Sequence, residues 1–418
     1  MAASPSAPLD LYNHPELWRW AGGMEGVPEW VDPAETFGER AGRAAWQARG
    51  NEWFALLGAL LPGLALALAL AVVGRAVSQA IGTGLLQLER SPVSPILLAI
   101  LVGLAVRNTI GLPAVYEAGV QLCLKRILRV GVALLGIRLS LGALGTIGLA
   151  ALPIVIGCIA AALLLVSWIS RAVGLPRRLG TLIAVGTAIC GNSAIVATGP
   201  VIHAEEDEIS YAVGTITVFG LLALVTYPFV AHGIFGGDPS LAGFFLGTAI
   251  HDTAQVAGAG LLYSQQYAAP ETLDTATVTK LVRNLFMIAV IPIMALIYHR
   301  SNEDRDAIKK PRLTEMVPFF VFGFVGMALL RTVGDLGEEP FAGFLTSAQW
   351  DAGIELFTTL SAWCLTVAMA SVGLGTNLKR LRELGFKPLA AGLAAALIVG
   401  GVSAGLIHLL ASVLVQPA

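Results

Sequence analysis

Long apolar segments follow one another from residue 53 to residue 415, separated by short polar stretches. A membrane-crossing helix needs about 20 apolar residues. Eleven segments reach that length: 53–85, 92–111, 124–146, 149–171, 179–202, 209–234, 241–263, 275–299, 313–333, 352–377 and 387–415. The pattern predicts an all-α polytopic membrane protein with about eleven transmembrane helices. Residues 1–52 lack such a segment and are expected to form a cytoplasmic N-terminal extension before a transporter domain over 53–415.

The loop charges predict an orientation. Basic side chains gather in four stretches, namely 107–126, 171–178, 300–312 and 379–387, and acidic ones in 203–208, 271–274 and 335–339. With eleven crossings the two sets fall on opposite sides of the membrane. Because short cytoplasmic loops carry an excess of Lys and Arg, we expect the N-terminus inside and the C-terminus outside.

Composition agrees with a membrane protein. The chain is 56% hydrophobic and 13% charged, whereas soluble domains carry about 25% charged residues. The net charge of −2 gives no indication of nucleic acid, so the expected surroundings are the lipid bilayer and, as a candidate arrangement, a homodimer. The four cysteines show neither a disulfide pattern nor metal-ligand spacing, and we expect no cofactor and no metal.

Two kinds of internal similarity are present. Pro95, Gly103 and Arg107 match Pro318, Gly326 and Arg331, and residues 136–141 match 373–378. The matched segments are seven spans apart, so they run in opposite directions, as in an inverted repeat, with repeat one over about 92–234 and repeat two over about 241–415. Gly-Thr-Ala-Ile also occurs at both 186–189 and 247–250. Those spans are expected to run in the same direction, so either the two breaks face one cavity or the match is chance.

The fifth span is interrupted by Cys190-Gly191-Asn192-Ser193-Ala194. Gly is unfavourable inside a helix, and Asn or Ser is a preferred N-cap. The helix is therefore expected to unwind at Gly191 and to begin again near Asn192 or Ser193. A new helix start offers free N–H groups and a positive dipole end, so Gly191, Asn192 and Ser193 are candidate substrate-binding residues. The alternative is a helix–helix contact through small residues.

The seventh span contains His251, Asp252, Thr253 and Gln255 in an otherwise apolar stretch. Ionisable groups at membrane depth are costly and usually functional. Asp252 is a candidate coupling residue that holds a proton or Na⁺, and His251 is a candidate proton relay or substrate ligand. Thr253 and Gln255 are candidate substrate ligands. The alternative is a buried polar cluster that only fixes helix packing.

Three further polar residues lie in the predicted spans. Arg283 lies about two turns into the eighth span and is a candidate partner of Asp252 or of substrate. Arg138 and Asn377 are expected near opposite ends of the membrane. They are candidate gate residues, with ordinary anchoring at the membrane interface as the alternative.

The chain resembles the YeiH-like putative sulfate exporter family of bacterial inner-membrane proteins. The resemblance rests on Arg107-Asn108, on residues 134–140, on 188–194 and on 251–259. It implies a cation/proton antiporter and bile-acid-symporter-like architecture, with inverted repeats of five helices, broken crossover helices, and core and panel domains. It also implies a multi-pass protein of the bacterial inner membrane.

The expected function is therefore a secondary transporter, not an enzyme, that moves a small sulfate- or sulfite-like or organosulfur oxyanion by alternating access, with proton or cation coupling. An anion channel or an exporter of another small organic anion is the alternative. An intramembrane enzyme is a further one, although Ser193 and His251 lie in no nucleophile or metal-ligand motif.

Overall fold

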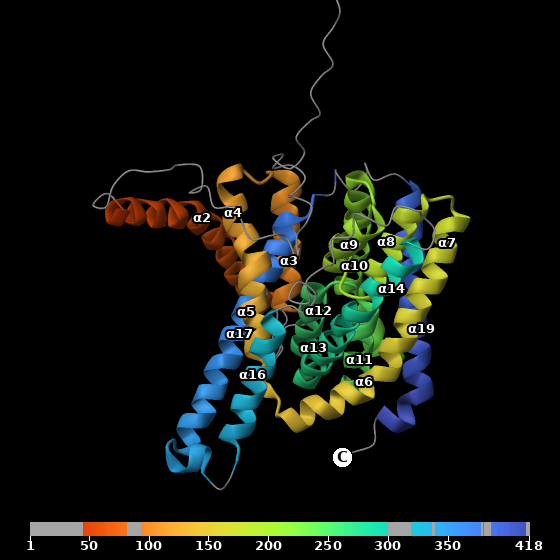
Figure 1. Ribbon diagram of the computed structural model, residues 1–418. Coiled ribbons are helices and arrows are strands. Elements are labelled where there is room, and N and C mark those ends of the chain that lie inside the picture. The colour runs from red at the N-terminus through yellow and green to blue at the C-terminus, as the bar shows by residue number, and fades with distance from the viewer. Residues whose placement is uncertain are drawn as a thin grey trace, which may run out of the picture.

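The computed structural model describes residues 45–81, 93–299, 319–336, 339–377, 379 and 386–414. These residues are almost entirely helical and contain no strand (Figure 1), which confirms the all-α prediction. Most of the expected N-terminal extension, residues 1–44, lies outside the described residues, and its last part, 45–52, begins the helix α2, Ala45–Gln79.

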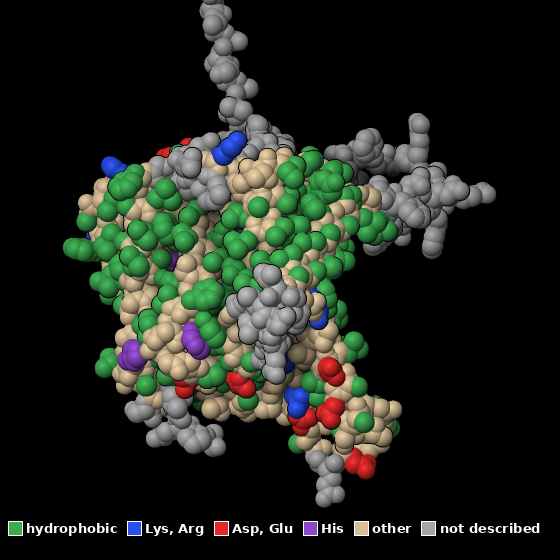
Figure 2. Space-filling view, turned by 180° about the vertical axis from the view of Figure 1, so that it is seen from behind, with side chains coloured by type: hydrophobic (Ala, Val, Ile, Leu, Met, Phe, Trp, Pro, Cys, Tyr) green, Lys and Arg blue, Asp and Glu red, His purple; other side chains and the backbone are tan. Residues whose placement is uncertain are grey.

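Six helical stretches in the described part of the chain are long and apolar enough to cross a membrane. They are Leu57–Gln79, Leu141–Ala172, Glu206–Ile234, Pro270–Tyr298, Ser347–Gly375 and Phe386–Ala411. Many large hydrophobic side chains lie exposed on the outside, for example Leu164 and Phe322. Figure 2 shows hydrophobic side chains over most of one face. An exposed apolar surface of this extent suits lipid and not water, and it supports a multi-pass membrane protein.

The helices fall into two groups, which we call the panel and the core. The panel lies at the left of Figure 1. Its elements are α2, α3 (Pro95–Thr109), α4 (Ala114–Leu122), the π-helix η4 (Cys123–Ile127), α5 (Leu128–Leu135), the 3-10 turn η5 (Gly136–Arg138), α16 (Phe319–Gly334) and α17 (Ser347–Gly375). The helices of the panel approach one another closely at glycines. A Cβ on Gly103 would lie 2.6 Å from the Ala370 carbonyl oxygen, and a Cβ on Gly136 would clash with the Phe324 carbonyl oxygen.

The core lies at the right of Figure 1. It begins with a long crossing segment, α6 (Leu141–Ala161), the π-helix η6 (Ala162–Val166) and α7 (Ser167–Ala172). It continues through α8 (Arg177–Ala188), α9 (Asn192–Thr198), α10 (Glu206–Ile234), α11 (Pro239–Ala249), α12 (Thr253–Tyr267), α13 (Pro270–Leu285) and α14 (Met287–His299), and it ends with α19 (Phe386–Leu414). One large cluster of buried hydrophobic residues fills the core.

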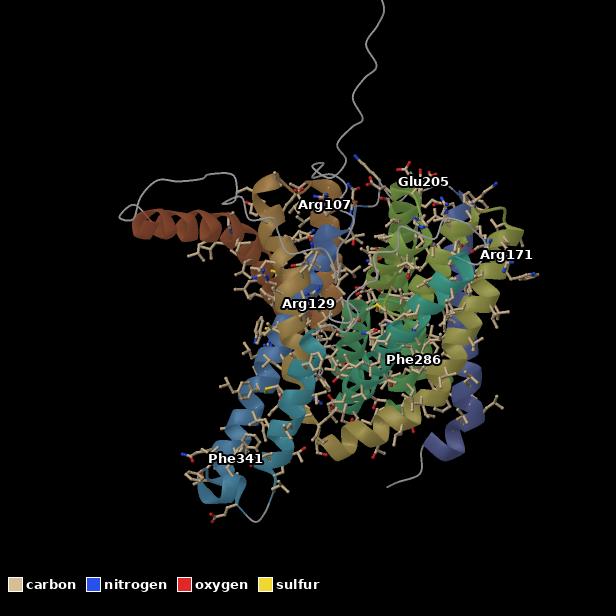
Figure 3. All side chains as sticks on the ribbon, in the orientation of Figure 1. Arg107, Arg129, Arg171, Glu205, Phe286 and Phe341 are labelled. Carbon is tan, nitrogen blue, oxygen red and sulfur yellow. The ribbon has the colours of Figure 1, made fainter. Side chains whose placement is uncertain are left out.

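The helices α8 and α9 form a hairpin that enters the core from the upper face and returns to it. The Ile195 side chain of α9 lies against Gly186 of α8, 2.7 Å from where a Cβ on that glycine would be. Residues nine apart could not meet in this way along a continuous helix, which rises 1.5 Å per residue. The chain therefore reverses between Ala188 and Asn192. Figure 3 shows Glu205 at the top, near the level of Arg107, with Arg171 lower but still in the upper part.

The helices α11 and α12 form a second hairpin, which enters from the lower face. Both helices pack along α13, in opposite directions. Going up α13, Gly243 and then Gly247 of α11 meet Thr275 and then Thr279, so α11 runs parallel to α13. Gly260 of α12 meets Leu273, and the Asn284 amide donates to the Thr253 hydroxyl at 3.1 Å, so α12 runs antiparallel.

This arrangement corrects the predicted topology. The segments 179–202 and 241–263 were expected to cross the membrane, but each turns back at its middle. The stretch 203–208 consequently lies on the same face as 171–178, not on the opposite one. The acidic stretch instead begins α10, where the Glu208 carboxylate accepts from the Glu205 N–H at 2.9 Å in a capping box. Carboxylates are favourable at a helix N-terminus. These acidic residues therefore mark the start of α10 and give no indication of the outer side of the membrane.

The third expected span, 124–146, is also displaced. A continuous run of helical elements, α4, η4, α5 and η5, extends from Ala114 to Arg138, and a new helix begins at Leu141 after its N-cap Ser140. Lys125, which was expected beside a loop, lies inside this run in the π-helix η4.

The hairpins predict which loops share a face. Cysteines replacing Arg171 and Asp207, both exposed, should react with an impermeant thiol reagent from the same side, in a variant without the four native cysteines. A cysteine replacing Glu271, which is exposed at the lower end of α13, should react only from the other side. If positions 171 and 207 are labelled from opposite sides, then α8 and α9 do not form a hairpin, and if position 207 is labelled together with position 271, then α11 and α12 do not.

Candidate functional site

The two hairpin tips meet inside the core. Gly191 forms the tip of the first hairpin with φ +71° and ψ −122°. Residues other than glycine rarely adopt this backbone conformation. A Cβ on Gly191 would lie 3.3 Å from the Cβ of Asp252, at the tip of the second hairpin. Gly191 therefore permits both the sharp reversal and the close approach of the two tips.

Arg283 of α13 binds the ends of both entering helices. Its Nε donates to the carbonyl of Ala188 at 2.7 Å, and its Nη2 donates to that of Thr187. Its Nη1 donates to the carbonyls of Thr248 and Ile250. The guanidinium is fully buried, so it satisfies carbonyls of both α8 and α11 that have no partner within their own helices.

Lys280 lies one turn before Arg283 and completes this arrangement. Its ammonium group donates to the carbonyls of Ile189 at 2.8 Å, of Ile250 at 3.0 Å and of His251. Positive charge is favourable at a helix C-terminus, and no water reaches carbonyls at this depth of a bilayer. Together Lys280 and Arg283, which we call the cation clamp, fix both hairpins to α13.

The clamp explains the repeated Gly-Thr-Ala-Ile sequence. In each copy the Thr carbonyl accepts from Arg283 and the Ile carbonyl accepts from Lys280. The two copies end α8 and α11, which enter from opposite faces. The expectation that these segments run in the same direction was therefore wrong, and of the two interpretations the meeting of both breaks at one place is correct.

Asp252 and Gln255 form a capping box at the start of α12. The Asp252 carboxylate accepts from the Ala254 N–H at 2.8 Å, and the Gln255 side-chain oxygen accepts from the Asp252 N–H at 3.3 Å. Gln255 lies directly against Gly220 of α10, where a Cβ would clash with its amide. The first amides of α12 are thus satisfied by the protein's own carboxylate.

The polar side chains of the first hairpin point in different directions. The Asn192 amide donates to the Thr217 hydroxyl of α10 at 3.2 Å, and the Gln255 amide lies 3.5 Å from the Thr217 carbonyl. Thr217 thus connects the starts of α9 and α12. Ser193, in contrast, lines a cavity at the tips.

His251 lies at the tip of the second hairpin and is fully buried. Neither ring nitrogen has a hydrogen-bond partner among the described residues. Buried polar groups are rarely left unpaired, so the ring is available to a water or a substrate oxygen. The Lys280 ammonium binds the His251 carbonyl, so the ring lies close to a fixed positive charge.

The cavity lies between the tips and the panel. The core contributes Cys190, Ser193, Asp252, Thr253 and Ala254, and the panel contributes Leu124, Lys125, Leu128, Arg129, Val132 and Phe320. Figure 3 shows Arg129 at mid-height. The cavity has a volume of about 20 Å³, which is room for about one water. Neither Lys125 nor Arg129 was identified as a site residue from the sequence. Lys125 was counted among the charges beside a loop, and Arg129 was not singled out within the expected span 124–146.

Arg138 and Asn377 occupy different surroundings. Arg138 joins the panel to the core on the lower face, where its guanidinium lies 2.8 Å from the Asp274 carboxylate of α13 and donates to the Pro270 carbonyl at 3.3 Å. Asn377 lies at the upper end of α17, and its side chain accepts from the Lys379 N–H at 3.0 Å in a local turn. Only Arg138 lies at the junction between panel and core.

Comparisons with known proteins agree on one family. A family model described as "Conserved hypothetical protein 698" matches residues 62–392. A UPF0324 membrane protein of Chlorobaculum tepidum is 35% identical over 73% of this chain and 82% of its own length. One of Nitratidesulfovibrio vulgaris is 30% identical over 82% and 92%. The UPF0324 membrane protein TauZ of Paracoccus pantotrophus is 36% identical over 75% and 88%. No solved structure matches the chain.

The cation clamp predicts a large stability loss on removing Arg283. Arg283→Gln should lower the free energy of unfolding in detergent by about 3 kcal/mol, because it leaves buried charged hydrogen bonds unmade. Arg171→Gln is the matched control, since Arg171 is exposed on α7. Equal unfolding free energies for the two variants would mean that the clamp does not hold the hairpins.

Proposed function

Because the chain belongs to the UPF0324 (YeiH) family of membrane proteins, we propose that it is a secondary transporter of a small oxyanion. Its substrate class is sulfate-like, sulfite-like or organosulfur, and it works by alternating access in the bacterial inner membrane. Membership confirms the resemblance seen in the sequence. In this proposal the protein moves its substrate unchanged and is not an enzyme.

The observation that carries this proposal is the meeting of two hairpins from opposite faces beside a cavity. Transporters commonly bind substrate near the midplane, where discontinuous helices end. The cavity lies between two helix groups, so movement of the core against the panel would open it to either face. Its lining supplies the hydroxyls of Ser193 and Thr253 and two positive charges, Lys125 and Arg129, which suit the oxygens of an anion.

The cation clamp favours proton coupling over Na⁺ coupling. In many transporters the carbonyls of unwound helices and half-helix C-termini coordinate Na⁺. Here those carbonyls are bound by Lys280 and Arg283, so Na⁺ would have to displace a buried side-chain cation.

Asp252 is the proposed proton carrier. It lines the cavity and is 7% exposed. Lys125 of η4 and Arg129 of α5 line the same cavity, and Lys280 of α13 binds the carbonyl of the preceding residue, His251. His251 is the proposed relay. An ionised carboxylate is unfavourable beside an anion, since two like unit charges 4 Å apart repel by roughly 4 kcal/mol at an effective dielectric of 20 and a divalent anion doubles this, so binding of the anion favours the protonated acid.

The roles of Arg283 and Asn192 in this proposal differ from the first expectation. Arg283 acts through its charge and its hold on the hairpins, because its donors are directed at backbone carbonyls. Asn192 positions the start of α9 through Thr217. The direct ligands are Ser193 and Thr253, with His251 as a further candidate.

The panel supports an inverted repeat with the basic face in the cytoplasm. Gly136, at the end of α5, packs on Phe324 of α16, and Gly373, near the end of α17, packs on Ile100 of α3. The two repeats thus exchange equivalent contacts. Arg107 and Arg171 lie toward the upper face and Phe341 at the lower one (Figure 3), so the positive-inside rule puts the upper face inside.

Transport itself is tested by flux measurements on the purified chain in proteoliposomes. Radiolabelled sulfate should enter saturably, exchange for unlabelled sulfate inside, and accumulate under an inward proton gradient. Empty liposomes are the control. A current that rises linearly with voltage would indicate a channel, and conversion of the added anion to a product would indicate an enzyme.

Replacing Asp252 separates its charge from its capping contact. Asp252→Asn keeps an oxygen that can accept from the Ala254 N–H, so it should fold, bind sulfate and exchange it, but lose accumulation driven by a pH gradient. Asp252→Ala should in addition lose about 1 kcal/mol of stability with the cap. An Asp252→Asn protein that accumulates sulfate as well as the unchanged chain removes Asp252 from coupling.

The Arg138–Asp274 pair is expected to hold the lower side of the cavity closed. The side chains are 19% and 12% exposed. Arg138→Gln should raise the reaction rate of Cys190, which lines the cavity, with a thiol reagent applied from the lower face by about fivefold, since such pairs contribute ~1 kcal/mol. Arg331→Gln is the matched control, because the Arg331–Asp335 pair lies within the panel. An unchanged rate in Arg138→Gln means that the pair is no gate.

A further inference from the structure

Two basic side chains of the panel face the hairpin tips at mid-height. Lys125 lies in the π-helix η4 and Arg129 follows four residues later in α5. Both are half-buried and both line the cavity that Ser193, Asp252 and Thr253 line from the core. Arg126, between them in sequence, is exposed and does not line the cavity.

This placement is unfavourable without an anion. Two like charges four residues apart on a helix repel each other, and cations at membrane depth are costly. One carboxylate, Asp252, shares the cavity with them. When Asp252 is ionised the three lining charges sum to +1, and when it is protonated they sum to +2. The protonated cavity therefore matches the charge of a divalent anion.

We infer that Lys125 and Arg129 form the panel half of the substrate site and make it select doubly charged over singly charged oxyanions. The inference rests on the proposed transport function. Ser193 and Thr253 hold the anion from the core, while Lys125 and Arg129 hold it from the panel. Because the volume of about 20 Å³ holds little more than a water, the long basic side chains move aside as the anion enters. When core and panel shift, the anion loses one half of its ligands and is released.

The π-helix supports this assignment. A π-helix is rare, occurs mostly as a single turn inside an α-helix, and is frequent at functional sites. Cys123 of η4 packs against Ala67 and Ala71 of α2 and against Val367 of α17. This packing fixes the outer side of the segment, so that Lys125 and Arg129 share the inner side.

The test compares two anions with the same tetrahedral sulfur chemistry and different charge, sulfate and methanesulfonate. Uptake into proteoliposomes is measured for the full chain and for Lys125→Gln, Arg129→Gln and Arg129→Lys, with Arg126→Gln as the matched control. Lys125→Gln and Arg129→Gln should raise the half-saturating sulfate concentration about tenfold or more, the effect of losing one charged hydrogen-bond partner. The half-saturating concentration of methanesulfonate should change by less than about threefold in the same variants. Arg129→Lys should keep the preference for sulfate, and Arg126→Gln should resemble the unchanged chain.

The outcomes separate the two proposals. If the unchanged chain takes up neither anion, the proposed function fails before any variant is compared. If it takes up sulfate and both Gln variants do so equally well, the panel cations are not part of the site. If the half-saturating concentrations of both anions rise equally, these residues hold substrate without selecting its charge, and the inference is overturned. Should Arg129→Gln fail to give a monodisperse protein, Arg129→Lys and Lys125→Gln decide alone.

Discussion

The structure depends on how six backbone carbonyls are satisfied in the middle of a membrane. They belong to Thr187, Ala188, Ile189, Thr248, Ile250 and His251, at the ends of two helices that stop before crossing. A chain that stops at this depth exposes carbonyls that neither its own helix nor lipid can bind. Lys280 and Arg283, one turn apart on α13, supply the donors for both ends. One helix thus makes two reversals possible at one point.

The same solution determines the electrostatics of the tips. The clamp places two positive charges at the negative ends of α8 and α11, the kind of helix end at which many secondary transporters coordinate a cation. Asp252 is directed to the start of α12 and not to the clamp. The core alone therefore carries an excess of positive charge near the tips, and the panel adds Lys125 and Arg129 across the cavity. The core and the panel therefore both present positive charge to the cavity.

Much of this could be predicted from the sequence, for definable reasons. Apolar length identified the membrane segments, and the cost of burying His251, Asp252 and Arg283 identified the residues that meet at the tips. Hydropathy cannot distinguish a crossing helix from a hairpin of two half-helices, since both are apolar and of similar total length. The prediction that 179–202 and 241–263 each cross the membrane in one direction was therefore wrong. Arg129 was missed because its side is set by the π-helix and by packing on α17, which no local pattern of residues reports.

The junction between panel and core follows from a short piece of chain. Arg138, Leu139 and Ser140 connect α5 to α6 on the lower face, with Leu139 in an extended conformation and Ser140 capping α6 by accepting from the Ala143 N–H at 3.2 Å. The Leu141 N–H donates to the Thr332 hydroxyl of α16 at 2.8 Å, so the first turn of α6 stays bound to the panel. Arg138, three residues earlier, binds the core at Asp274. The connection between panel and core and the ion pair that joins them therefore lie on the same few residues, on the lower side of the cavity.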